Sequence, residues 1–252
     1  MILMKINVLG HRGASAYAPE NTAPAFKLAI EMKADGVEND IRMTKDGVYV
    51  VSHNSTIQEM SDGEGQVELM TYDELLQFDF GFKAGEKFKG TKILTIDEFL
   101  DIVKDMNVIN IEMKPLEPCV NRQHAYKCIY ESIIAHGCMD RVIVSSFDHG
   151  ALLELKEAYP MIKTGLLYAR SLTLQETLDM IETFKADAIH PHHSVLTPEI
   201  AAACKEKGVL MNPWTVDCEP DVLRCKEMGV TGIISNVPDI VLKILKENGA
   251  HD

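Results

Sequence analysis

Short runs of apolar residues alternate with amphipathic segments from one end of the 252-residue chain to the other. The apolar runs have the length and composition of β-strands, and the segments between them repeat with the period of an α-helix. The strands are predicted at residues 6–9, 36–41, 108–112, 142–145, 163–167, 188–190, 209–212 and 232–234. The helices are predicted at residues 23–32, 96–104, 120–136, 150–158, 172–184, 198–207, 220–228 and 238–246.

This alternation predicts an α/β fold with a parallel sheet. Eight strand-helix units within 252 residues have the usual size of a (β/α)₈ TIM barrel, so we expect one barrel domain over residues 1–252. The alternative is an open doubly wound sheet, which usually has fewer strands and a glycine-rich phosphate loop after the first one. Neither a G-x-G-x-x-G motif nor a P-loop occurs in the chain, which favours the barrel.

One interval is too long for a barrel loop. Between His53 and Thr95 the chain carries five glycines and four phenylalanines, at positions 78, 80, 82 and 88. We expect an insertion after the second strand, at approximately residues 55–94, with a small aromatic cluster of its own. Long loops in compact domains are usually lids or binding elements, and an ordered cover over the barrel edge is the alternative; the sequence leaves both open.

The formal net charge of −13 argues against non-specific binding to nucleic acid or to an anionic membrane. No apolar run approaches the length of a membrane span, and Met1-Ile2-Leu3-Met4 is a poor secretion signal because Lys5 interrupts it. We therefore expect a cytoplasmic protein without stable membrane association.

The cysteines are dispersed without a CxxC motif, so disulfides and zinc are not expected; they are Cys119, Cys128, Cys138, Cys204, Cys218 and Cys225.

Several chemically active residues lie at or just beyond the carboxyl ends of predicted strands. In chain order they are His11, Glu38 and Asp40, then His53 after the apolar run 48–51, then Glu112, Lys114 and Trp214. In a (β/α)₈ barrel the active site lies at the carboxyl ends of the strands. The predicted fold therefore brings these residues together at one mouth of the barrel.

The carboxylates among them suit a hard metal ion. Glu38 and Asp40 are two residues apart, so their side chains point to the same side of a strand. With Glu112 from the neighbouring strand they form an oxygen-only set suited to Ca²⁺ or Mg²⁺. The alternative is a purely structural set of ion pairs with Arg42 or Lys114. The convergence of three carboxylates on adjacent strand ends favours the metal site.

A bound cation, basic side chains and paired histidines together are typical of a metal-assisted phosphodiester hydrolase, in which the cations neutralise phosphate oxygens and the histidines move protons. The remaining histidines are interpreted as structural, at positions 124, 136, 149 and 251. His190, His192 and His193 follow the sixth strand, and we expect them to line the mouth, with their role open.

An ordered series of short motifs runs through the whole chain. In the first half they are His11-Arg12-Gly13, residues 19–22 (PENT), 34–40 (ADGVEND), 44–47 (TKDG), 50–53 (VVSH) and 110–114 (NIEMK). In the second half they are residues 144–147 (VSSF), 213–216 (PWTV) and 232–234 (GII). In these motifs the chain resembles the glycerophosphodiester phosphodiesterase family.

The resemblance implies a (β/α)₈ barrel with a small insertion after the second strand. It also implies roles for residues of this sequence: Glu38, Asp40 and Glu112 as ligands of one divalent metal ion, His11 and His53 as the acid/base pair, Arg12 and Lys114 as phosphate-facing cations, and Trp214 on the glycerol side. The implied substrates are small molecules, deacylated phospholipids such as glycerophosphocholine, cut to sn-glycerol 3-phosphate and an alcohol. Glu20 and Asn21 match the family, and as cap and turn residues they are also compatible with a purely structural role.

The chain departs from the family pattern at three positions. Asn54 stands where the family usually has aspartate after the second histidine, and Thr231 and Asn236 replace acidic residues near the last strand. Two other functions stay open: cleavage of lysophospholipids, and non-catalytic binding of glycerophosphodiesters. The sequence does not determine the headgroup of the substrate, the identity of the metal or the oligomeric state. It also leaves open which histidine is the acid and which is the base, and whether water or the glycerol 2-hydroxyl is the attacking group.

Overall fold

The computed structural model describes residues 5–117 and 120–251. The Met1–Met4 segment and Cys119, to which two of the predictions above refer, lie outside the described residues, as does Asp252. The other five cysteines are free thiols. None of the described helices is long and apolar enough to cross a membrane, and the cytoplasmic location stays a prediction.

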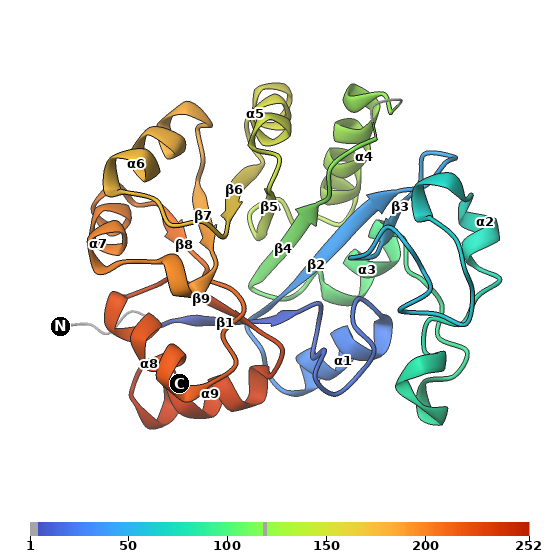
Figure 1. Cartoon of the computed structure of the whole chain (residues 1–252), viewed down its shortest axis with the longest axis horizontal. Coiled ribbons are helices and arrows are strands. Elements are labelled where there is room, and N and C mark those ends of the chain that lie inside the picture. Colours follow the sequence, from blue (N-terminus) through green and yellow to red (C-terminus); the bar gives the residue numbers. More distant parts are fainter. Residues whose placement is uncertain (1–4, 118–119, 252) are drawn as a thin grey trace.

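Eight parallel strands in the described part of the chain form the predicted TIM barrel (Figure 1). They are β1 (Asn7–His11), β2 (Gly36–Met43), β4 (Val108–Met113), β5 (Val142–Ser146), β6 (Lys163–Tyr168), β7 (Ala188–Pro191), β8 (Leu210–Met211) and β9 (Gly232–Ser235). Each pairs with its neighbour along the order β8-β7-β6-β5-β4-β2-β1-β9. Backbone hydrogen bonds from Thr231 N to Met211 O (3.0 Å) and from Ile234 N to Pro213 O (3.0 Å) join the two ends of this series.

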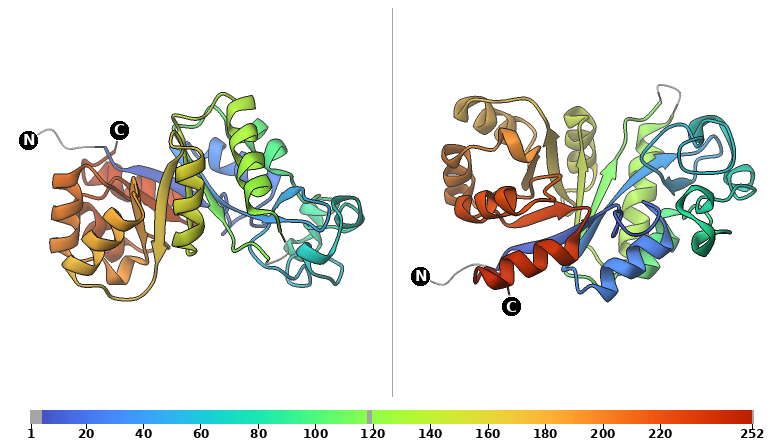
Figure 2. Two further views of the ribbon diagram at one scale, coloured as in Figure 1. Left: turned by 90° about the horizontal axis from the view of Figure 1, so that it is seen from above. Right: turned by 60° about the horizontal axis from the view of Figure 1, so that its bottom comes forward.

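Helices surround the strands on the outside, as the two further views show (Figure 2). They are α1 (Ala23–Glu31), α3 (Ile96–Val103), α4 (Arg122–Ala135), α5 (His149–Ala158), α6 (Leu174–Thr183), α7 (Pro198–Lys207), α8 (Glu219–Met228) and α9 (Pro238–Glu247). The Thr95 side chain caps α3 in a capping box with Glu98. Gly208 ends α7 at φ 71°, in the left-handed region that glycine adopts without strain. All predicted strand and helix ends lie within two residues of those observed.

Strand alternation decides which side chains enter the barrel. In β2, Val37 and Ile41 belong to the apolar cluster that includes Phe26 of α1, so they face the helices. Glu38 and Asp40 alternate with them and therefore face the interior. The same alternation in β4 buries Ile109 and Ile111 in that cluster and turns Asn110 and Glu112 inward.

Residues 55–94 form a separate layer beside the barrel mouth. They follow β3 (Tyr49–Val51), which pairs antiparallel with β2, and contain α2 (Tyr72–Leu75) and the short turns η1 (Val67–Leu69), η2 (Phe82–Ala84) and η3 (Glu86–Phe88). Their buried core consists of Ile57, Val67, Leu75, Phe80 and Ile93, together with Val50 of β3.

The predicted aromatic cluster in this segment is wrong in its composition. Phe80 is buried and Phe78 packs against the core, but the side chain of Phe82 is 55% exposed. Phe82 begins a short turn between Gly81 and Gly85 that lies on the surface, and aliphatic side chains fill the interior instead. The segment is therefore ordered mainly by aliphatic burial.

Asp35, between α1 and β2, ties both chain ends to the barrel. Its carboxylate accepts hydrogen bonds from Val8 N (2.9 Å) and His251 Nε2 (2.8 Å) and lies 2.6 Å from Lys5 Nζ. Burial by itself raises the pKa of a carboxyl, but Lys5, Val8 and His251 outweigh it and hold the pKa of Asp35 below its ordinary value.

Asp35→Asn should lower the free energy of unfolding at pH 7 by about 1.5–3 kcal/mol, the range for hydrogen bonds to a charged group. Because folding lowers the pKa of Asp35, its stabilisation is fully present above the unfolded pKa of about 4 and is lost as the pH falls through the folded value. Urea unfolding between pH 7 and pH 3 should show the gap to wild type narrowing. Asp105→Asn, at an exposed position, is the control, and a pH-independent gap would contradict this account.

Candidate active site

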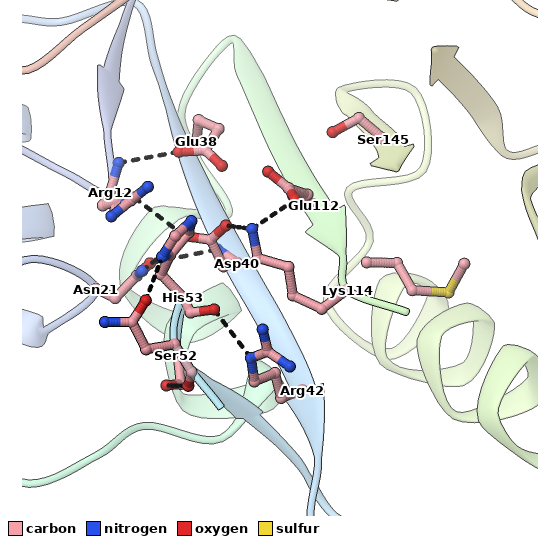
Figure 3. Close-up of polar contacts among 12 residues, drawn as sticks. Arg12, Asn21, Glu38, Asp40, Arg42, Ser52, His53, Glu112, Lys114 and Ser145 are labelled. Atoms are coloured by element: carbon pink, nitrogen blue, oxygen red, sulfur yellow. Dashed lines mark hydrogen bonds and ion pairs between the residues drawn. The ribbon is translucent and has the colours of Figure 1, made fainter. Parts of the chain in front are cut away.

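The predicted site residues meet at the carboxyl ends of β1, β2 and β4. His11, the last residue of β1, is paired in register with Glu38 of β2. Asp40 of β2 is paired with Glu112 of β4. Figure 3 shows the side chains of Glu38, Asp40 and Glu112 gathered on one side of the two strands. The strand register therefore assembles the carboxylates without any contribution from loops.

The three carboxylates are close together and buried. One oxygen atom from each of Glu38, Asp40 and Glu112 lies within 4.8 Å of the others, and the residues are 3%, 1% and 9% exposed. Burial, together with the neighbouring carboxylates, raises the pKa of Glu38 well above its ordinary value and that of Glu112 to about 7. Burial would also raise the pKa of Asp40, but the Lys114 ammonium and the Arg12 guanidinium hold it below its usual range.

Two cations offset part of this negative charge. Lys114 Nζ lies 2.7 Å from Asp40 Oδ1 and 2.5 Å from Glu112 Oε1. Arg12 donates its backbone N–H to Glu38 Oε2 (3.0 Å), and its Nε lies 3.3 Å from Asp40 Oδ2. The donor set is all oxygen and its charge is incompletely balanced, so the residues fit a hard divalent cation.

The alternative interpretation of the carboxylates, as ion-pair partners of Arg42 or Lys114, agrees with the structure only for Lys114. Lys114 does bridge two of the carboxylates, but Arg42 contacts none of them. It donates to the carbonyl oxygen of His53 (2.9 Å) and to Glu68 Oε1 (2.6 Å). Arg42 therefore links the loop that carries His53, toward which its side chain points in Figure 3, to Glu68 in residues 55–94.

Glu20 and Asn21, for which the sequence allowed a purely structural role, both contact site residues. Glu20 accepts two 3.0 Å hydrogen bonds from Arg12 Nη1. Asn21 donates to Asp40 Oδ2 (2.8 Å). Arg12 and Asn21 adopt left-handed backbone conformations, at φ 56° and 59°, which cost energy in residues with a Cβ. The turn after β1 is thus shaped around the carboxylates.

His11 and His53 flank the carboxylates. His11 Nε2 lies 3.9 Å from Glu38 Oε2. Burial lowers the pKa of both histidines; Arg12 contributes to the lowering at His11, and Lys114 and Arg12 to that at His53. A lowered pKa favours neutral imidazoles at neutral pH, which can accept a proton.

Two cavities open beside the carboxylates. The smaller one, about 100 Å³, is lined by His11, Glu38, His53 and Glu112 and, at its far wall, by Trp214. The larger one, about 490 Å³, lies toward residues 55–94, and both include Arg12 and His53 in their walls. A bound molecule can therefore extend to either side of the carboxylates.

Two aromatic side chains, Phe147 and Trp214, line the smaller cavity. Trp214 donates Nε1–H to the carbonyl oxygen of His190 (2.8 Å) and makes edge-to-face contacts with Phe147 (centroids 5.8 Å apart) and His192 (5.3 Å). Phe147 was not identified as a site residue from the sequence; its position directly after β5 was the available signal.

The three clustered histidines differ in position. His190 does not line the mouth as expected, because it is fully buried in β7, and burial lowers its pKa to about 3. His192 packs against Trp214, as stated above, and His193 Nδ1 lies 3.3 Å from Asp221 Oδ1.

Comparisons with known proteins point to one enzyme family. The model of the glycerophosphoryl diester phosphodiesterase family matches residues 11–240. A glycerophosphodiester phosphodiesterase of Caldanaerobacter subterraneus subsp. tengcongensis is 38% identical over 98% of this chain and 100% of its own length. One from Bacillus subtilis is 30% identical over 96% of this chain and 87% of its own length.

Solved structures share the fold. A putative glycerophosphodiester phosphodiesterase from Galdieria sulphuraria has a TM-score of 0.84 at 26% identity, covering 98% of this chain and 100% of its own. A phosphodiesterase from Oleispira antarctica, solved with the product sn-glycerol-3-phosphate, has a TM-score of 0.88 at 24% identity, covering 96% of this chain and 97% of its own.

Divalent cations should stabilise the protein after treatment with a chelator. Binding only to the folded state adds about 2.7 kcal/mol at a concentration of 100 times Kd, so Ca²⁺ or Mg²⁺ should raise the thermal midpoint. Glu38→Gln imitates the protonated carboxyl, so it should keep the metal-free midpoint and lose most of the increase. Glu206→Gln, at an exposed position of α7, should behave as wild type. Equal midpoints with chelator and with saturating cation would disprove a metal site.

Proposed function

Because the chain belongs to the glycerophosphoryl diester phosphodiesterase family, we propose that it hydrolyses glycerophosphodiesters to sn-glycerol 3-phosphate and an alcohol. The substrates are deacylated phospholipids such as glycerophosphocholine. The observation that carries the proposal is the barrel mouth, where three buried carboxylates lie close together and two histidines and two cations line the same cavity as Glu38 and Glu112. This is the set of groups that a phosphodiester cleavage requires.

The phosphate group of the substrate lies beside the carboxylates and is held there by cations, because carboxylates alone would repel it. Glu38, Asp40 and Glu112 would hold a Ca²⁺ or Mg²⁺ ion, which would neutralise phosphate oxygens. Arg12 and Lys114, which lie beside Asp40, add positive charge for the non-bridging oxygens. The two cations thereby stabilise the charge that develops on the phosphorus centre during displacement.

The two histidines move the protons. One of them takes the proton from the attacking hydroxyl, which belongs to water or is the glycerol 2-hydroxyl, and the other protonates the leaving alkoxide. Attack by the glycerol 2-hydroxyl first gives a cyclic phosphate, which water then opens to sn-glycerol 3-phosphate. His11 and His53 both line the smaller cavity, so both reach a phosphate bound there. Trp214 forms the wall on the glycerol side, where its ring excludes water.

A retained pair of histidines argues against a protein that only binds glycerophosphodiesters, because binding requires no proton transfer. A lysophospholipid substrate has an acyl chain that must be covered by apolar side chains, and residues 55–94 expose two large ones, Leu69 and Phe82. We include this substrate in the test.

The function is tested with purified protein and three substrates: glycerophosphocholine, glycerophosphoethanolamine and a lysophospholipid. We expect release of sn-glycerol 3-phosphate from the first two, loss of turnover with EDTA, and recovery with Ca²⁺ or Mg²⁺. Turnover of the lysophospholipid alone would overturn the substrate assignment, and full activity after confirmed metal removal would overturn the role of the carboxylates.

Substitution of the histidines tests the proton transfer. Positioned acid/base groups are typically worth about 10²–10⁴-fold in rate, so His11→Ala and His53→Ala should each lower kcat by about that factor and remain folded. His124→Ala, at an exposed position of α4, should stay near wild type. A normal kcat for His53→Ala would show that the assignment is wrong.

A further inference from the structure

Each of the two histidines in the mouth contacts an asparagine. His11 Nδ1 lies 2.7 Å from Asn236 Oδ1, although the two residues are 225 positions apart. The amide of Asn236 in turn donates Nδ2–H to Asp217 Oδ2 (2.6 Å), and its backbone N–H donates to Asp217 Oδ1 (2.8 Å). Ser15 Oγ also donates to Asn236 Oδ1 (2.8 Å).

These contacts determine which atoms carry hydrogen. A carboxylate only accepts hydrogen bonds, so the amide nitrogen of Asn236 must face Asp217, and its oxygen must face His11. That oxygen also only accepts, so the hydrogen of a neutral His11 must be on Nδ1. The lone pair is then on Nε2, the nitrogen that lies 3.9 Å from Glu38.

The second histidine has the same arrangement, built from unrelated residues. His53 Nδ1 lies 2.8 Å from Asn54 Oδ1, and Asn54 Nδ2 donates to Glu59 Oε2 (2.7 Å). Asn236 follows β9 whereas Glu59 belongs to the segment that contains α2, and Figure 1 shows β9 and α2 on opposite sides of β1 and β2. Two independent segments of the chain therefore form the same hydrogen-bonded series, in which a carboxylate contacts an amide and the amide contacts an imidazole at the barrel mouth.

We propose that Asn236 and Asn54 are positioning residues that hold His11 and His53 with hydrogen on Nδ1 and with Nε2 directed to the substrate, and that Asp217 and Glu59 orient the two amides. The proposal rests on the proposed function for its catalytic consequence, but the tautomer itself is independent of the substrate. An amide oxygen accepts from Nδ1–H of a neutral or a protonated ring alike. The ring therefore keeps one orientation while it takes up and releases a proton at Nε2.

The two asparagines and the two carboxylates should contribute to kcat by different amounts. Asp217 and Glu59 are exposed, and exposed polar contacts are worth about 0–1 kcal/mol, which corresponds to at most about fivefold in rate. The asparagines contact the histidines directly, and groups that orient a functional side chain typically change activity by about 10–100-fold. The asparagine substitutions should thus have the larger effect.

The first test reads the tautomer without any substrate. Nitrogen-15 NMR of histidine-labelled wild-type protein at pH 8 should show His11 and His53 with hydrogen on Nδ1, and Asn54→Ala should convert His53 to a mixture of tautomers while His11 stays unchanged. Signals of His11→Ala and His53→Ala assign the two rings. If His11 and His53 carry hydrogen on Nε2 in the wild type, the proposal is wrong whatever the substrate proves to be.

The second test measures kcat and KM separately with glycerophosphocholine. Asn54→Ala and Asn236→Ala should each lower kcat about 10–100-fold and leave KM within about twofold of wild type, whereas Glu59→Gln should lower kcat only a few-fold. Asn54→Asp keeps an acceptor for Nδ1–H of His53, so its kcat should be well above that of Asn54→Ala and close to wild type. Asn107→Ala, at an exposed position, is the matched control. An unchanged kcat for Asn54→Ala beside an inactive His53→Ala would overturn the positioning role, whereas inactivity of the wild type on this substrate would instead count against the proposed function.

Discussion

The repulsion among three buried carboxylates is the constraint around which the mouth of this barrel is arranged. Glu38, Asp40 and Glu112 present oxygens within 4.8 Å of one another and are at most 9% exposed. Buried like charges at this separation repel strongly unless protons or cations intervene. Lys114 and Arg12 supply part of the compensation, while burial and the neighbouring Asp40 and Glu112 raise the pKa of Glu38.

The surrounding structure holds these charges in place. The turn after β1 adopts left-handed conformations at Arg12 and Asn21, and it thereby aims one cation and one amide at Asp40. Glu20 pairs with Arg12, which limits the positions that its guanidinium can take. On the other side, Arg42 connects His53 with Glu68, so that residues 55–94 and the histidine loop are held as one unit.

At both histidines an amide stands between the imidazole and a carboxylate. A carboxylate in contact with either histidine would add a negative charge close to a group of carboxylates that already repel each other. Asn236 and Asn54 supply the same hydrogen-bond acceptor without that charge, and the charged groups, Asp217 and Glu59, lie one residue further out, where they are exposed to solvent. Exposure to water screens their effect on the site.

The sequence by itself determined the elements and the faces of the strands. Period-two alternation in residues 36–43 is local information, and it was sufficient to put Glu38 and Asp40 on one side and to predict their meeting with Glu112 at the barrel mouth. The tertiary structure alone decided which distant residues meet there and how deep each one lies. Asn236 reaches His11 across 225 positions, Phe147 joins Trp214, and His190 is buried rather than lining the mouth. Such pairings and depths depend on the stagger of the strands and the paths of the loops, which no local pattern encodes.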